Sequence, residues 1–378
     1  MRTLFFLVLL FSLLSTAQAD SQVSMSLNSF ECECSWQGIW LDVILLIDNS
    51  NSMTAPGLAQ IKAHVATMVH YMNISDNERD SHFGVISYSH KPTLVRDITQ
   101  PQSVESVTDS IIDMKYSGSG DLNINEALEL ASQQLEKSKR RNARKVIIIY
   151  GTVLSPKDNP FQTADQLKEA GISIVTVAFL QSSEGSLAKR VGELASPGMN
   201  LTSLQPELFE RVKEVLCDAN CFCPVGWQQF RKDTGGLQSL GQCFMYGNLD
   251  ANWFSARFAC EREGGYLMAA VTNKYLQQVK AYLQEVGEDP SAFYKLHVGL
   301  RFQNVYDNYV WEGGFGVLAS PFETNWCAGF PNLSRGRAVL SVVSTENDDH
   351  CWVNEDQFAV PSRYICQKRS CDAGKFCR

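Results

Sequence analysis

The sequence predicts two unlike domains in series: a doubly wound, Rossmann-like α/β domain and, after it, a disulfide-rich α+β domain. The placement of the cysteines and a change of hydrophobic periodicity support this prediction. Ten of the twelve cysteines lie at or after Cys217, and the 378-residue chain has none between Cys34 and Cys217. A long segment without disulfides must be stabilised by a hydrophobic core of its own, so we place a domain boundary there.

The α/β prediction for residues 40–217 comes from strand and helix patterns that alternate along the chain. Nearly continuous apolar runs are typical of parallel strands covered on both faces, and apolar residues at helical spacing separate them. Strands are expected at 40–48, 82–89, 91–98, 145–150 and 172–180, with 91–98 at an edge. Helices are expected at 56–71, 123–136, 163–171, 185–195 and 206–216. This order predicts a doubly wound sheet.

The first of these strands ends in a D-x-S-x-S motif formed by Asp48, Ser50 and Ser52. Ligands of doubly wound sheets sit beyond the carboxyl ends of the strands. One carboxylate and two hydroxyls offer three oxygens on one turn to a hard cation such as Mg²⁺ or Ca²⁺. The alternative, which we favour, is that these side chains cap a loop by hydrogen bonding.

Order, length and motif together resemble a von Willebrand factor type A domain. The resemblance implies a divalent-metal site for adhesion, completed by a Thr from a second loop and an Asp after the fourth strand. Here the second loop, SGSGDLNINEAL, has no Thr, although Asp121 or Asn123 is a possible substitute, and Tyr150 occupies the Asp position. Tyr is a poor ligand because its pKa is about 10. We therefore expect a degenerate site with weak metal binding or none.

The cysteine-rich half begins with a short hinge, residues 218–222, and continues from 223 to 367. Helices are expected at 250–263 and 272–286, the second capped by Thr272, and short strands near 296–300, 310–314 and 363–367. The segments CPVGW, WFSARFAC, LHVGL and RYICQ resemble a C-type lectin-like domain. The domain order is similar to that of secreted nematode C-type lectins that carry a type A domain in front.

The lectin resemblance also implies a set of disulfides. Cys260 would pair with Cys366 and Cys223 with Cys243, while a displaced inner bridge would join Cys327 to Cys351. The ends of a type A domain lie close together, so Cys32 and Cys34 are expected to meet Cys217 and Cys221. Cys371 and Cys377 remain to close a small terminal loop.

The same resemblance locates the loop that would hold Ca²⁺ and sugar. Its E-P-N position reads Phe330-Pro331-Asn332, and its W-N-D position falls on Val353, Asn354 and Glu355. Two amides and one carboxylate are few for Ca²⁺, which takes 6–8 oxygens. We expect weak or absent Ca²⁺ binding, and sugar stacking on exposed aromatics such as Phe330 or Trp326. Sequons predict N-glycosylation at Asn73, Asn200 and Asn332.

The amino-terminal residues 1–19 have the pattern of a secretory signal peptide, followed by an N-terminal segment, 20–39, that contains Cys32 and Cys34. Arg2 precedes an apolar run at 4–14, and Ala17-Gln18-Ala19 resembles a cleavage site. That run is shorter than the roughly 20 residues of a membrane span. A secreted, extracellular chain with no membrane span is therefore expected, and residues 368–378 are expected to form a C-terminal tail.

Composition narrows the functional class. The net charge of −8 argues against nucleic acid as a partner, and no Lys/Arg-rich block suggests an anionic membrane surface as a partner either. The chain contains none of the motifs H-E-x-x-H, G-x-S-x-G and G-x-x-x-x-G-K-[ST], so an enzyme is not expected. We predict a secreted binding protein that recognises carbohydrate or a surface through the lectin-like domain, with innate defence as one setting. The alternatives are extracellular protein–protein adhesion and a matrix component without sugar binding.

Overall fold

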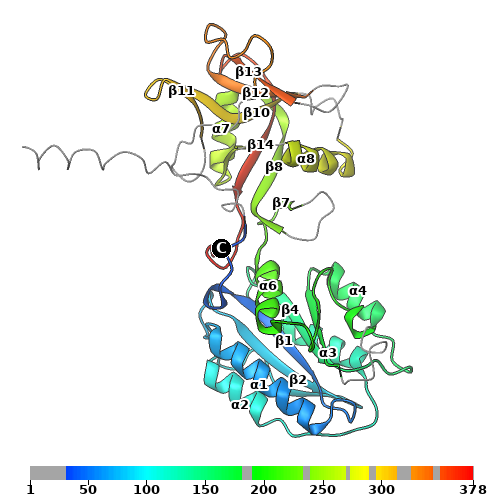
Figure 1. Cartoon of the computed structure of the whole chain (residues 1–378). Coiled ribbons are helices and arrows are strands. Elements are labelled where there is room, and N and C mark those ends of the chain that lie inside the picture. Colours follow the sequence, from blue (N-terminus) through cyan, green and yellow to red (C-terminus); the bar gives the residue numbers. More distant parts are fainter. Residues whose placement is uncertain are drawn as a thin grey trace, which may run out of the picture.

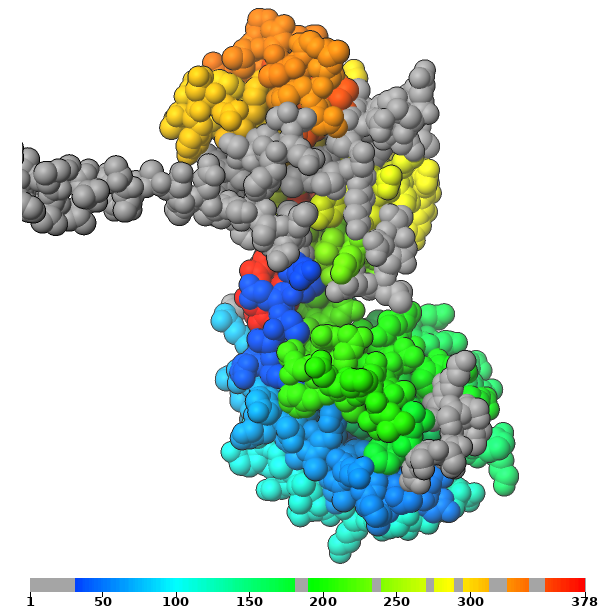
Figure 2. All heavy atoms as spheres, viewed as in Figure 1, coloured from blue at the N-terminus to red at the C-terminus, as the bar shows by residue number. Residues whose placement is uncertain are grey.

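A computed structural model describes residues 31–180, 190–232, 239–269, 273–288, 295–312, 325–343 and 350–377. The predicted signal peptide, residues 185–189 of the predicted helix 185–195 and the expected cap Thr272 lie outside these residues. Figure 1 shows two domains stacked end to end, and Figure 2 shows how narrow the connection between them is. We call this connection the waist; it comprises residues 31–40, 217–224 and 369–377.

The lower domain is built on one six-stranded sheet with the order β3-β2-β1-β4-β5-β6 (Figure 1). All neighbours are parallel except β3, which pairs antiparallel with β2 at the edge. The bounds are β1 (Leu41–Asp48), β2 (His82–Tyr88), β3 (Pro92–Arg96), β4 (Arg144–Gly151), β5 (Ser173–Ala178) and β6 (Asn200–Thr202). Every residue of β1 is buried, as expected of a strand covered on both faces.

Helices pack on both faces of this sheet. One hydrophobic core lies under α1 (Ala55–Tyr71), α2 (Val104–Ile112) and α6 (Leu208–Asn220), and a second lies under α3 (Ile124–Lys137) and α4 (Phe161–Glu169). The doubly wound fold is thereby confirmed. The hinge expected at 218–222 is corrected, because α6 continues through Asn220 and residues 218–220 form its last turn.

The upper domain is an α+β fold on an eight-stranded sheet whose main path is β13-β12-β10-β14-β8-β7, with β11 beside β10 and β9 beside β14. The strands are β7 (Gln228–Arg231), β8 (Ser239–Ala251), β9 (Tyr266–Leu267), β10 (Lys295–Gln303), β11 (Asn308–Trp311), β12 (Ala338–Val343), β13 (His350–Glu355) and β14 (Ser362–Arg369). The helices are α7 (Trp253–Arg262) and α8 (Asn273–Glu285), close to their expected bounds. Sequence reasoning missed β8, whose Gly and polar residues break the alternation of a strand.

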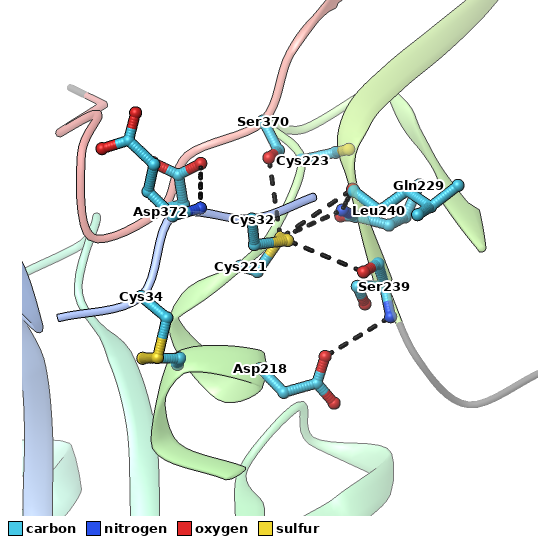
Figure 3. Close-up of a disulfide and its surroundings, with 12 residues drawn as sticks. Cys32, Cys34, Asp218, Cys221, Cys223, Gln229, Ser239, Leu240, Ser370 and Asp372 are labelled. Carbon is cyan, nitrogen blue, oxygen red and sulfur yellow. Dashed lines mark hydrogen bonds between the residues drawn. A yellow bond between two sulfur atoms is a disulfide. The ribbon is translucent and has the colours of Figure 1, made fainter. Parts of the chain in front are cut away.

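Six disulfides join the twelve cysteines. Within the upper domain they are Cys223–Cys243, Cys260–Cys366 and Cys327–Cys351, the pairs that the lectin resemblance implies. The waist holds Cys32–Cys221, Cys34–Cys217 and Cys371–Cys377. Figure 3 shows the first two of these bridges beside the end of α6.

Residues 31–39 and 369–377, the described parts of the expected N-terminal segment and C-terminal tail, meet at the waist. Trp40 donates its indole N–H to the Asp372 carbonyl at 3.1 Å. Phe222 and Cys371 exchange backbone hydrogen bonds of 3.0 and 2.9 Å. The Trp40 ring also packs on Phe222 and Phe376. Disulfides, hydrogen bonds and aromatic contacts therefore tie both chain ends to the junction of the domains.

Candidate functional site

The D-x-S-x-S motif lies at the carboxyl end of β1, where Asp48 is fully buried. One oxygen of its carboxylate accepts the Ser50 backbone N–H at 2.9 Å. The other accepts two bonds from Thr152, from the hydroxyl at 2.5 Å and from the backbone N–H at 3.2 Å. Burial raises the pKa of Asp48 above its usual value, although these hydrogen bonds oppose the change. Asp48 thus joins the ends of β1 and β4 directly.

Thr152 is the residue that sequence reasoning missed. Tyr150, which the resemblance placed at the metal position, instead points into the core under α1, with its ring 5.9 Å from that of His64. Successive side chains of a strand alternate between faces, so a residue at the strand's carboxyl end need not face the loop. A hydroxyl two residues further on, in the segment YGT, was the signal available in the sequence.

The other residues proposed for this site do not converge on Asp48. Asp121 is exposed and lies 3.6 Å from His90. Asn123, the possible substitute, caps α3 by accepting the Glu126 N–H at 3.1 Å. Ser50 is fully buried, and Ser52 is half-buried in the turn that follows β1.

The loop chemistry does not fit the metal that the resemblance implies. A hard cation needs several free oxygens, and here the one carboxylate already accepts three hydrogen bonds from protein donors. The second loop is fastened to the first by backbone bonds, among them Asn51 N–H to Ser119 O at 2.8 Å. Within the described residues, no group of three or more His, Cys, Asp or Glu is placed to hold a metal. We therefore derive no step through a metal at this site.

In the upper domain, Asn354 is the buried centre of the candidate lectin loop. Its amide donates to the carbonyls of Asn332 at 2.7 Å and Gly336 at 2.6 Å. Its carbonyl accepts the Asn332 backbone N–H at 2.7 Å. A Cβ at Gly336 would lie 2.1 Å from the Glu355 backbone, so the loop passes too close to β13 for any larger residue. One side chain thus holds both ends of the turn.

The remaining candidate ligands of this loop also have partners. Asn332 accepts from the Ser334 N–H at 3.1 Å and from its hydroxyl at 2.7 Å. Glu355 forms an ion pair with Arg335 at 3.2 Å. The Arg335 guanidinium also lies 5.4 Å from the centre of the Phe330 ring. The loop therefore presents an arginine on an aromatic face where the resemblance would have an acidic cation site.

The second aromatic candidate for sugar stacking, Trp326, is packed against neighbouring side chains. Its backbone bridges to Trp352, and its half-buried ring meets Tyr309 at 4.7 Å and Trp352 at 5.8 Å. The Cys327–Cys351 disulfide fixes the same two segments. The expectation of an exposed Trp326 was wrong, because the neighbouring bridge draws it against the core.

The three sequon asparagines, Asn73, Asn200 and Asn332, are all exposed. Asn73 follows α1, and Asn200 begins the edge strand β6. A glycan on Asn332 would stand on the lectin loop itself. Glycosylation at these positions stays a prediction.

Residues 42–214 match the family model of the von Willebrand factor type A domain, and the lower domain is a domain of that kind. Along most of its length the chain is similar to C-type lectin domain-containing protein 160 of Caenorhabditis elegans. The two are 28% identical over 371 residues, which are 92% of this chain and 56% of that protein. The chain thus spans about half the length of this curated relative.

Two solved structures are also similar. Proximal thread matrix protein 1 from the mussel byssus, with a zinc-occupied MIDAS motif, is 18% identical with a TM-score of 0.43, over 53% of this chain and 52% of that chain. The C-type lectin domain of murine dendritic cell inhibitory receptor 2, in complex with N-glycan, is 17% identical with a TM-score of 0.28. This match covers 39% of this chain and 99% of the mouse chain.

The chain therefore combines a type A domain with a C-type lectin-like domain, as the sequence predicted. These two kinds of domain support a role in extracellular recognition or adhesion, and both are typically binding domains. In the described ranges, no helix has the length and apolar content needed to cross a membrane.

Proposed function

We propose that the chain is a secreted binding protein whose lectin-like domain recognises carbohydrate without a bound metal ion. One observation carries the proposal: the Asn354 amide is fully used in holding the backbone of its own loop. A Ca²⁺-dependent lectin loop needs such oxygens free for the ion. Here the loop is shaped by protein hydrogen bonds, so recognition would not depend on Ca²⁺.

The contact surface we propose is the Arg335–Phe330 pair together with Arg337. An aromatic face offers an apolar surface to a sugar ring, and a guanidinium offers fixed donors to its oxygens. Arg337 already contacts the Asn304 amide oxygen and lies 5.4 Å from the Phe302 ring centre. Both arginines are exposed, and the pair therefore favours hydroxyl-rich or acidic sugars. Innate defence is the setting in which recognition of foreign surfaces of this kind is expected.

A protein partner is the second candidate function, and an exposed apolar patch favours it. Phe254 and Phe358 are 45% and 57% exposed, with ring centres 5.3 Å apart. Phe258 on α7 is also exposed. Exposed aromatic groups of this size are common in protein interfaces. The patch lies on α7 and on the segment before β14.

A glycan array with the full chain separates the two functions. The array is probed in Ca²⁺ and in EDTA, with Phe330→Ala as the test variant and Phe258→Ala, which removes an exposed ring elsewhere on the same domain, as the control. We expect the same glycans to be bound in both buffers, and weaker binding only for Phe330→Ala. Binding that disappears in EDTA would contradict a metal-free lectin, and no binding in either buffer would favour the protein partner.

A further inference from the structure

A basic segment precedes β4 and stands out in a chain of net charge −8. Six of the nine residues from Lys137 to Lys145 are Lys or Arg. The expectation that the chain has no Lys/Arg-rich block was therefore wrong. A local concentration of cations in an acidic chain creates a positive field that the overall charge conceals.

Two of the six cations are already neutralised within the domain. Lys137 pairs with Asp97 at 2.5 Å. Arg140 pairs with the buried Asp42 at 3.1 Å and donates to the Glu78 carbonyl at 3.1 Å. For the other four, Lys139, Arg141, Arg144 and Lys145, the described part of the chain supplies no ion-pair partner within 4.0 Å.

These four cations line one cavity of about 980 Å³ where the type A domain meets the waist. Its far wall is made of Pro224, Val225 and the Cys371–Cys377 bridge. No Asp or Glu is among the described residues that line it. One side of the cavity is therefore lined by positive charges of the type A domain, and the opposite wall is uncharged.

The waist keeps this arrangement in place. The Arg144 guanidinium stacks 4.4 Å from the centre of the Phe222 ring. Phe222 is bonded through its backbone to Cys371, and its ring packs on Trp40. Because the wall and one cation are fixed before any ligand arrives, binding would lose less entropy than on a flexible surface.

We propose that this basic pocket binds a sulfated glycan chain. Sulfate groups accept hydrogen bonds from guanidinium and ammonium donors, and Arg supplies them in a planar fork. A concave pocket between a domain and a waist admits a thin chain but not a flat membrane. The six disulfides are typical of the extracellular environment, where such glycans occur and nucleic acid is not the usual partner. The site is distinct from the Asn332 loop and does not rest on it.

The test measures binding of the full chain to heparin, a sulfated polysaccharide, at about 0.15 M salt, where weak long-range attraction is screened. The test variant is Lys139→Gln/Arg141→Gln, because both side chains are exposed and the fold does not need them. The control is Lys91→Gln/Lys157→Gln, which removes the same charge from exposed lysines outside the pocket. Thermal unfolding checks that both variants keep the wild-type fold.

We expect the pocket variant to bind heparin about tenfold more weakly, the scale of a lost charge-assisted contact, while the control binds as wild type. Equal weakening of both variants would overturn the proposal, because it would mean unspecific attraction. It would also be overturned if the wild type ignored heparin at this salt. Stronger, pocket-dependent binding to phosphatidylserine vesicles or to single-stranded DNA would assign the pocket to a different partner and would likewise reject the proposal.

Discussion

The hydroxyl of Thr152 gives a direct test of whether the D-x-S-x-S motif is structural. Thr152→Val keeps the side-chain shape and removes one O–H donor from the buried Asp48 carboxylate, a bond of 2.5 Å. Hydrogen bonds to charged groups contribute about 1.5–3 kcal/mol, and the backbone bond to Asp48 remains. We therefore expect a loss of about 2 kcal/mol, or roughly 4–8 °C in the Tm of a domain of this size.

The assay is scanning calorimetry of the full chain, following the transition of the type A domain with and without Mg²⁺. Thr67→Val is the matched control, because the Thr67 hydroxyl is exposed and bonds only a helix carbonyl at 2.8 Å. It should change stability by less than about 0.5 kcal/mol. A change as small as this for Thr152→Val would refute the structural role of the motif.

A working metal site would change the Mg²⁺ dependence of the Tm in the same experiment. A ligand at 100 times its Kd stabilises the native state by about 2.7 kcal/mol. We expect no such stabilisation of the wild type by millimolar Mg²⁺. A clear Mg²⁺-dependent rise in Tm that Asp48→Ala abolishes would show that the site binds metal after all.

Two further predictions concern the upper domain. His297 is buried with its Nε2–H facing the carbonyls of Ala251 and Val360, and burial lowers its pKa to about 4. A lowered histidine pKa destabilises the native state as pH falls from 6.5 toward 4, because the unfolded chain binds the proton first, and the loss approaches about 3 kcal/mol. His297→Gln should flatten this pH dependence in urea unfolding, and an unchanged slope would contradict it. A non-reduced peptide map should contain a Cys327–Cys351 peptide; finding either cysteine free would contradict the displaced bridge.

Most elements of the lower domain could be predicted from the sequence because they depend on hydrophobic periodicity, which each element carries locally. The short elements α2 and β6 were not expected, and neither were β7, β8, β9, β12 and β13 of the upper domain. The residue near the end of β4 that contacts Asp48 could not be predicted. Tyr150 lies inside β4 and faces the core, whereas Thr152 lies just past the end of β4 and contacts Asp48, so the contact depends on where the strand ends. The waist was missed for a related reason: the contact of Trp40 with Asp372 joins positions 332 residues apart. No local pattern encodes a contact of that kind.

The Asn332 loop of the upper domain also has a feature that could not be predicted from the sequence. The motif positions pointed to Asn332, on the loop before β12, and to Asn354 and Glu355, at the end of β13, and Asn354 does contact the Asn332 backbone. The sequence did not reveal that Asn354 turns its amide toward its own backbone. That choice follows from the tight passage at Gly336, where the chain leaves no room for another side chain.

Calorimetric titration of Ca²⁺ into the EDTA-treated full chain tests the central claim most directly. The claim is that the Asn332 loop is held by Asn354 and by the Arg335–Glu355 ion pair, and not by an ion. We predict no saturable binding heat up to millimolar Ca²⁺, for the wild type and for Glu355→Gln alike. A saturable isotherm at micromolar Ca²⁺ that Glu355→Gln removes would contradict the account.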